Sequence, residues 1–394
     1  MSRAFYHGAR SPDLGSPVLD MDEAVARTAG TWLGDGIPEP RLLYVPLIFP
    51  HPPFEVEEPR FSMHDRSAQA PPIPHRPEGR RGYVAAIHET GGLDRLGPDD
   101  WAEIRATYAG MVSRVDHFLG RVMAAVDRGG MDDRTAAFFF PDQGEYLGDH
   151  GLVEKWIAGL EPAPVHHPLI VRAPGGTSGQ VVRSPVELLD VVATMAELAD
   201  VELGHRHFSR SLVDLLHDAE APHRAFAVSE AGIGPGESTV DDAAFPYDLK
   251  HSLERDRPEI TGRAIVVRWP EWTYAHRVSD VDELYDRRTD PQERHTLAAD
   301  PSRAGTVAEL RTLMLDWLMS TADAVPTDID PRFDTAGALS GRAASLAHAP
   351  RRSGGCCRDV ARRCTHRAGH GLTRVPVRRA HELRPRSWRR RTRR

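Results

Sequence analysis

The longest helical pattern in the sequence runs from Trp101 to Val126, where apolar residues recur at spacings of three and four. Arg128-Gly129-Gly130 ends this pattern, and the wholly apolar run from Ala136 to Phe140 follows soon after. A short strand without a polar position is typical of a sheet that helices cover on both faces. A helix that returns into such a strand predicts an α/β domain with a mainly parallel sheet sandwiched between helices.

Other segments continue this alternation of helices and strands. Apolar spacing predicts helices over Asp22 to Leu33 and over Ser184 to Leu198, the second with Ser184 as its N-cap and Glu187 completing a capping box. Leu42 to Phe49 and Pro168 to Val171 are apolar runs suited to buried strands.

The pattern of the sequence changes after about residue 240, where the alternation of helices and strands gives way to segments typical of a smaller antiparallel unit. Ala264 to Arg268 and Trp272 to Val278 are predicted to pair as antiparallel strands, and Val307 to Met319 is predicted to form a closing helix. Earlier in the chain, residues 56–92 are rich in proline, arginine and glutamate without a clear period. They predict a long surface loop.

The last part of the chain has a composition of its own. From about residue 335 it is rich in alanine, glycine, serine and arginine with no apolar period, so it cannot bury a core. Arg351 to Arg394 holds 16 arginines against two acidic residues, whereas the whole chain has a net charge of −7. We therefore predict a partial α/β domain at residues 1–240, a smaller C-terminal antiparallel α+β subdomain at residues 241–334 and a disordered tail at residues 335–394. The tail resembles out-of-frame translation of a GC-rich gene, and the less favoured alternative is a basic arm that binds nucleic acid.

Cysteine and lysine are used unevenly. All three cysteines, Cys356, Cys357 and Cys364, lie in the basic tail at spacings that fit no standard zinc site. Lys155 and Lys250 are the two lysines of the chain, against 48 arginines (50 − 2). A chain that favours arginine so strongly, and keeps Lys155 in its most polar segment, indicates a site that needs a compact ammonium group rather than a planar guanidinium.

A dense cluster of polar residues follows the apolar strand that ends at Phe140. Ligands of open α/β sheets bind at the carboxyl ends of strands, so Asp142 and Gln143 are expected to project into such a site. Both side chains offer the oxygen ligands that a hard cation such as Ca²⁺ prefers. A polar turn between a strand and a helix is the alternative that the pattern alone leaves open.

The same segment resembles the hallmark motif of the sulfatase family, in the alkaline-phosphatase superfamily. It reads Asp142-Gln143-Gly144-Glu145-x-Leu147-Gly148-Asp149-His150-Gly151-Leu152-x-x-Lys155. Four more segments are similar to family segments and occur in the family's order: Pro50-His51-Pro52-Pro53-Phe54, Pro168-Leu169-Ile170-Val171, Val186-Glu187-Leu188-Leu189-Asp190 and Glu283-Leu284-Tyr285-Asp286. The resemblance covers roughly residues 20–330 and implies the alkaline-phosphatase-like fold.

The resemblance implies a role for each matched residue. Asp142 and Gln143 would be ligands of Ca²⁺, or of Mg²⁺ or Mn²⁺ in its place. Lys155 and His51 would each contact an oxygen of the sulfate group, and His51 would also assist the leaving group. A divalent cation, a point positive charge and a proton donor suit a transition state with the charge of a dianion. The alternative for His51 is a packed loop histidine.

The sequence departs from the family pattern at the nucleophile. Family members convert the cysteine or serine of a Cys-x-Pro-x-Arg segment into formylglycine, and the 394 residues contain neither that segment nor its serine version. The family's first strand, which carries two more metal carboxylates, also has no counterpart here. We interpret the chain as an N-terminally truncated member, or as one of two split pieces whose N-terminal half is missing.

The function expected from the resemblance is that of a sulfatase-type hydrolase, a sulfuric ester hydrolase, that is inactive as this isolated chain. Its partner would be a small-molecule sulfate ester. A phosphonate or phosphodiester hydrolase of the same superfamily and a non-catalytic remnant or binding protein are the alternatives. No apolar run is long enough for a membrane span and the first residues lack the apolar stretch of a secretory signal, so we expect no membrane association and a cytoplasmic location.

Overall fold

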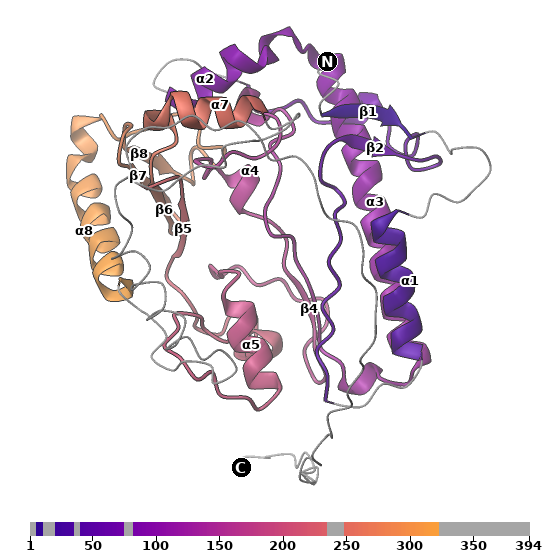
Figure 1. The fold of residues 1–394 in the computed structure, drawn as a ribbon. Helices are drawn as coiled ribbons and strands as arrows, with labels where there is room; N and C mark the ends of the chain where they lie inside the picture. The colour runs from indigo at the N-terminus through magenta and orange to yellow at the C-terminus, as the bar shows by residue number, and fades with distance from the viewer. Residues whose placement is uncertain (1–4, 11–19, 35–39, 75–81, 235–247, 323–394) are drawn as a thin grey trace, which may run out of the picture. The chain divides into compact units, whose positions relative to one another are not determined.

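The computed structural model describes residues 5–10, 20–34, 40–74, 82–234 and 248–322 (Figure 1). The helices are, in chain order, α1 (Met21–Gly34), α2 (Gly82–Gly91), α3 (Pro98–Arg128), α4 (Pro162–Val165), α5 (Asp190–Leu198), α6 (Val213–His217), α7 (Asp248–Asp256) and α8 (Ala304–Thr321). The strands are β1 (Tyr6–Ala9), β2 (Phe54–Val56), β3 (Ala137–Phe139), β4 (Ile170–Arg172), β5 (Ala227–Ala231), β6 (Ala264–Arg268), β7 (Trp272–Arg277) and β8 (Glu283–Asp286). The tail predicted at residues 335–394 lies outside the described residues.

The first two predicted helices are confirmed. α1 covers the residues expected from apolar spacing, and α3 extends its expected range at both ends because Pro98 suits the first turn and the Asp100 carboxylate accepts from Gly97 N–H (2.9 Å). The two helices pack side by side (Figure 1). Leu33 and Val126 form a small core between them.

The predicted C-terminal unit is confirmed as an antiparallel sheet in the order β5-β6-β7-β8. α8 covers one face of this sheet, where Leu310 and Met314 pack against apolar residues of β6, β7 and β8 (Figure 1). The sheet takes its first strand, β5, from before residue 241, so this subdomain and the α/β part are joined within a sheet. The boundaries at residues 240 and 334 remain predictions.

The other strand pairs are short. β1 pairs with β2 in parallel, and β3 pairs with β4 in an antiparallel ladder that sets Phe138 opposite Val171. β3 and β4 confirm that strands form near Ala136 to Phe140 and Pro168 to Val171. The expected burial of these strands is wrong, because β3 is only half-buried and Ile170 of β4 is 57% exposed. Their pairing brings the residues that follow β3 close to those that precede β4.

The strand expected over Leu42 to Phe49 is wrong as a hydrogen-bonded strand. The burial of residues 41–48 alternates strictly between half-buried and exposed, as in a strand, but these residues form no ladder. Leu42 and Tyr44 are 73% and 74% exposed. The segment is instead fixed at its end, where the buried Asp22 carboxylate accepts from Ile48 N–H (2.8 Å) and Phe49 N–H (2.9 Å).

Two further expectations are corrected. The loop expected at residues 56–92 contains α2, which buries four residues, among them Tyr83 and Ile87, in a hydrophobic core. The helix expected from Ser184 begins only at Asp190. The Glu187 carboxylate accepts from Val228 N–H (2.9 Å) and pairs with Arg224, so it does not serve a capping box with Ser184.

Among the described residues, no helix is both long and apolar enough to cross a membrane.

Candidate functional site

The hallmark segment forms an irregular loop between β3 and α4. Gly148 N–H donates to Leu152 O (2.7 Å), and Gly144 N–H donates to Pro164 O (2.9 Å). Both glycines are required. A Cβ at Gly144 would lie 2.0 Å from a backbone oxygen of α4, and Gly148 has a φ of 94°, which side chains rarely adopt. Close backbone packing therefore fixes the path of this loop.

Asp142 and Gln143, the predicted metal ligands, lie on the exposed side of this loop. Neither side chain makes a hydrogen bond or ion pair with another residue in the part of the chain that the structure describes. The pairing of β3 with β4 places Asp142 near His167. Burial and then the neighbouring His166 lower the pKa of His167, and the Asp142 carboxylate opposes them.

Asp149 and His150 anchor the loop. The Asp149 carboxylate accepts from Ile73 N–H (2.8 Å) and from the Arg105 guanidinium (2.5 Å), and His150 N–H donates to Ile73 O (2.7 Å). His150 is buried. These contacts fasten the loop to residues 71–74 and to α3, so both residues have a structural role.

Glu145 is a half-buried acid inside the loop. Its Oε1 accepts from Glu154 N–H (2.5 Å) and from Leu147 N–H (3.3 Å). Burial raises the pKa of Glu145 to about 7, and the Glu154 carboxylate adds to the rise, whereas these hydrogen bonds and Lys155 oppose it. Glu145 thus joins the two ends of the loop and changes its charge near neutral pH.

Lys155, the predicted sulfate contact, closes the segment beside a buried carboxylate. Its Nζ lies 3.4 Å from Glu154 Oε1. On the other side of that carboxylate, Lys250 Nζ lies 2.5 Å from Glu154 Oε2, and it donates to Lys155 O (2.6 Å). Glu154 is fully buried at a φ of 67°, in the left-handed region that favours glycine. The two lysines of the chain therefore meet at one carboxylate.

The C-terminal sheet holds the backbone that follows Lys155. Three donors reach consecutive parts of it: Gly232 N–H to Ile157 O (2.8 Å), Arg277 Nη1 to Ala158 O (2.7 Å) and Arg268 Nη2 to Leu160 O (2.5 Å). Arg277 is itself buried and paired with Glu283 (2.9 Å), which belongs to the predicted Glu-Leu-Tyr-Asp signature. Through Arg277, this signature therefore helps to hold the backbone that follows Lys155.

A second buried carboxylate ties the loop to α2. Glu161 accepts from the Tyr83 hydroxyl (2.5 Å) and from the Tyr146 hydroxyl, and all three residues are buried. Tyr146 belongs to the hallmark loop, so this cluster anchors the middle of the loop.

His51, the other predicted sulfate contact, lies half-buried in a turn. Its backbone N–H donates to Ile48 O (2.9 Å), and its Nδ1 lies 2.6 Å from Pro52 O. A carbonyl oxygen only accepts, so Nδ1 carries a proton and Nε2 holds the lone pair of the neutral ring.

One hydrophobic cluster joins the segments of the two predicted sulfate contacts. Phe49 and Phe54, on either side of His51, belong to the same cluster as Leu147 and Val153 of the hallmark loop. A shared core therefore holds both segments.

A complete metal site is not formed by the described residues. Asp142 and Gln143 offer two side-chain oxygens, and no group of three or more His, Cys, Asp or Glu residues suited to a metal ion occurs in the described ranges. Ca²⁺ takes six to eight oxygen ligands. Two ligands do not fit the ion by themselves, and metal binding by Asp142 and Gln143 stays a prediction.

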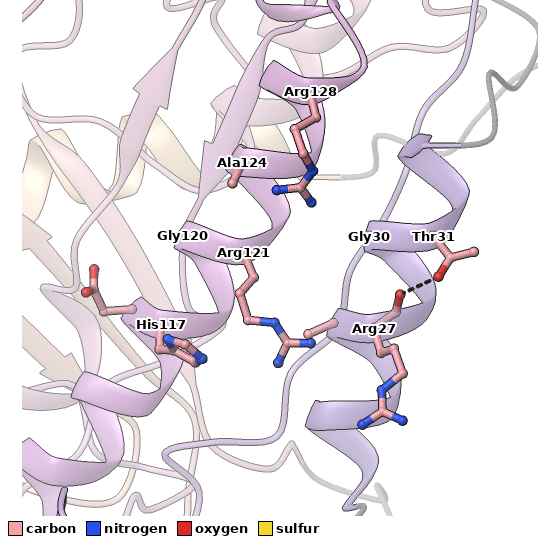
Figure 2. Close-up of a pocket in the computed structure, with 10 residues that line it drawn as sticks. Arg27, Gly30, Thr31, His117, Gly120, Arg121, Ala124 and Arg128 are labelled. Atoms are coloured by element: carbon pink, nitrogen blue, oxygen red, sulfur yellow. Dashed lines mark hydrogen bonds between the residues drawn. The ribbon is translucent and has the colours of Figure 1, made fainter.

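A separate hollow of about 650 Å³ lies between α1 and α3 (Figure 2). Arg27, Arg121 and Arg128 line it together with small residues, and Glu23 pairs with Arg27 (3.3 Å) and Arg121 (2.6 Å). None of the predicted site residues lines this hollow, and we assign it no part in the site.

Sequence reasoning assigned no role to Glu154 or Lys250. A buried acid in a polar loop has no local signature, and Lys250 is 95 residues away from Lys155. The scarcity of lysine was the one signal that could have paired Lys250 with Lys155.

Comparisons with known proteins agree with this geometry. The sequence model of the Sulfatase family matches residues 2–201, about half of the chain. The multifunctional alkaline phosphatase superfamily protein PehA of Trinickia caryophylli is 27% identical over 312 residues, which cover 72% of this chain and 57% of PehA. Arylsulfatase K of Danio rerio is 36% identical over 132 residues, 32% of this chain and 25% of that protein. The chain therefore spans little more than half the length of PehA.

Solved structures show the same fold. The phosphonate monoester hydrolase SpPMH from Silicibacter pomeroyi matches with a TM-score of 0.57 and 27% identity, over 70% of this chain and 55% of that one. The phosphonate monoester hydrolase of Agrobacterium radiobacter matches with a TM-score of 0.63 and 24% identity, over 79% of this chain and 65% of that one. The expected alkaline-phosphatase-like fold class is confirmed. With the hallmark loop, this fold and a family model that spans half of the sequence in agreement, the chain belongs to the sulfatase family.

Proposed function

We propose that this chain provides the anion-binding part of a sulfatase-type site that hydrolyses sulfate esters. The observation that carries the proposal is the placement of Lys155 on a backbone held by donors from the C-terminal sheet. An ammonium group carried by a firmly held backbone stabilises the charge of a sulfate oxygen with little reorganisation during the reaction. His51 would be the second contact, and Asp142 and Gln143 would contribute two ligands to a metal ion.

The nucleophile is the part for which this sequence has no candidate. No Cys-x-Pro-x-Arg or Ser-x-Pro-x-Arg segment occurs in the 394 residues. Hydrolysis through a covalent intermediate needs an activated nucleophile, and the groups named above only position charge. We therefore propose that turnover requires a segment with that motif in addition to this chain.

A phosphonate monoester is the second candidate substrate. The match to two phosphonate monoester hydrolases favours it. Both ester classes present a tetrahedral anion with oxygens that an ammonium group can contact, so the described residues do not discriminate between them.

The test is the initial rate on 4-nitrophenyl sulfate and on a 4-nitrophenyl phosphonate, with and without a co-expressed segment that carries formylglycine. We expect turnover only with the segment, and the better substrate identifies the ester class. Lys155→Arg should lower the rate about 100-fold, since a planar guanidinium does not reproduce a point contact. Arg255→Lys, on the exposed side of α7, is the control and should leave the rate unchanged.

Two results would contradict the proposal in different ways. Turnover by the chain alone, abolished by Lys155→Ala, would disprove the need for a second segment. Turnover that is indifferent to substitution of Lys155 and His51 would disprove the assignment of the site.

A further inference from the structure

The two lysines of the chain share one carboxylate, but not equally. Lys250 Nζ lies 2.5 Å from Glu154 Oε2, whereas Lys155 Nζ lies 3.4 Å from Glu154 Oε1. The shorter ion pair, between Lys250 and Glu154, joins α7 to the hallmark loop. The longer ion pair, between Lys155 and Glu154, joins two neighbours in the sequence. The charge of Glu154 is therefore taken up mainly by Lys250.

Glu154 needs such a partner because of where it lies. Its side chain is fully buried, and a buried carboxylate is strongly disfavoured without a cation next to it. Its φ of 67° is also unfavourable for a residue with a side chain. A residue that is costly in both respects is retained only where the surrounding contacts hold it firmly.

Lys250 is held firmly at three points. Besides the carboxylate, its ammonium contacts Lys155 O (2.6 Å) and lies 5.1 Å from the centre of the Trp156 ring. Burial lowers the pKa of Lys250, and the Glu154 carboxylate opposes this effect. The Lys250 side chain is 14% exposed, so it is a fixed counter-charge rather than a group that reaches for a ligand.

We propose that Lys250 is a positioning residue for Lys155: it neutralises Glu154 and so leaves the Lys155 ammonium available to an oxygen of the anionic substrate. The inference rests on the proposed function of Lys155. Without Lys250, Glu154 would have Lys155 as its near cation and would draw this ammonium away from the anion. Without the carboxylate of Glu154, Lys155 would lose its nearest competitor for the anion. The two changes should therefore act in opposite directions.

The scarcity of lysine makes a direct test feasible. Full-length chain produced with lysine carrying ¹³C at Cε should give two lysine signals by NMR, and Lys250→Met leaves the signal of Lys155 alone. Inorganic sulfate is the probe, titrated against sodium chloride of equal ionic strength. A thermal unfolding curve for each variant establishes that it folds.

In the natural sequence, sulfate should move the Lys155 signal. We expect Lys250→Met to raise the apparent dissociation constant of sulfate about tenfold, and Lys250→Arg, which keeps the charge, to stay within about twofold. Glu154→Gln should lower the dissociation constant severalfold.

The outcomes separate this inference from the function on which it rests. Lys250→Met and Glu154→Gln both weakening sulfate binding, or both leaving it unchanged, would overturn the role of Lys250 while Lys155 keeps its own. A Lys155 signal that sulfate does not move in the natural sequence would overturn the proposed contact of Lys155 itself.

Discussion

The two ends of the hallmark loop differ in how firmly this chain holds them. Asp142 and Gln143, at the first end, are exposed and make no hydrogen bond within the described ranges. Lys155, at the other end, lies among buried ion pairs, and the C-terminal sheet donates to the backbone beyond it. Catalytic geometry depends on a supporting layer of contacts, and the described residues supply that layer at the end of Lys155, the proposed anion contact, and not at the end of Asp142 and Gln143.

Glu161, which anchors the middle of the loop, offers the strongest way to disrupt the contacts that hold it. Glu161→Ala would remove the buried carboxylate that accepts from the hydroxyls of Tyr83 and Tyr146. We expect the free energy of unfolding to fall by about 3 kcal/mol. Urea denaturation measures it, with Glu197→Ala on the exposed face of α5 as the control. A fall as small as that of the control would show that the cluster does not support the loop.

The pH dependence of stability tests Glu145, which joins the two ends of the loop. The pKa of Glu145 is about 7 in the folded chain and has an ordinary value of 4.5, so the folded state binds the proton more tightly. This contribution is complete below pH 4.5 and is lost as the pH rises through 7.

Glu145→Gln should remove that dependence. We expect the natural sequence to lose about 2 kcal/mol of stability between pH 5 and 7.5 relative to this variant. Urea denaturation across this range measures it, and Glu230→Gln, at an exposed position of β5, should follow the natural sequence. Parallel curves for Glu145→Gln and the natural sequence would contradict the raised pKa.

The first end of the loop, at Asp142 and Gln143, should tolerate substitution. Asp142→Ala should change the free energy of unfolding by less than about 0.5 kcal/mol, because the side chain is exposed. Calorimetry should find weak Ca²⁺ binding, with a dissociation constant of about 1 mM or higher, that Asp142→Ala abolishes. Tight binding that survives the substitution would place the metal elsewhere.

The smallest expected effect concerns His167. The Asp142 carboxylate raises the pKa of His167 against burial and His166, so Asp142→Ala should lower this pKa further, by a fraction of a unit. An NMR titration of the histidine ring signals measures the change, with Asp200→Ala as a matched control. An unchanged His167 would mean that the two groups do not interact.

Local patterns predicted the regular elements well. The 3–4 spacing of α3 and the paired apolar runs of β6 and β7 each arise from residues close in sequence, so they could be read directly. α2 was missed because its short apolar face lies inside a region rich in proline and arginine. The start of α5 was misplaced because Glu187 bonds to a strand 41 residues later rather than to its own helix.

The residues of the site likewise divide into those that local sequence motifs identified and those whose role depends on tertiary contacts. The resemblance named Asp142, Gln143, Lys155 and His51 because the family motifs are contiguous in sequence. It gave no indication of Glu154 as a shared counter-ion, since that role depends on α7 folding back onto the loop. Contacts of this kind are set by tertiary structure and leave no periodic signal.

The extended segment at residues 41–48 has a consequence for the chain in solution. Leu42, Tyr44 and Ile48 lie on one side at 73%, 74% and 52% exposure, and the backbone beside them is in no ladder. An exposed apolar strip whose backbone belongs to no ladder adheres to other copies of the chain. Aggregation rather than unfolding is therefore expected to limit the protein concentration that can be reached. A charged residue at position 44 would act as a gatekeeper on this strip, and its benefit would appear in light scattering while the melting temperature stays the same.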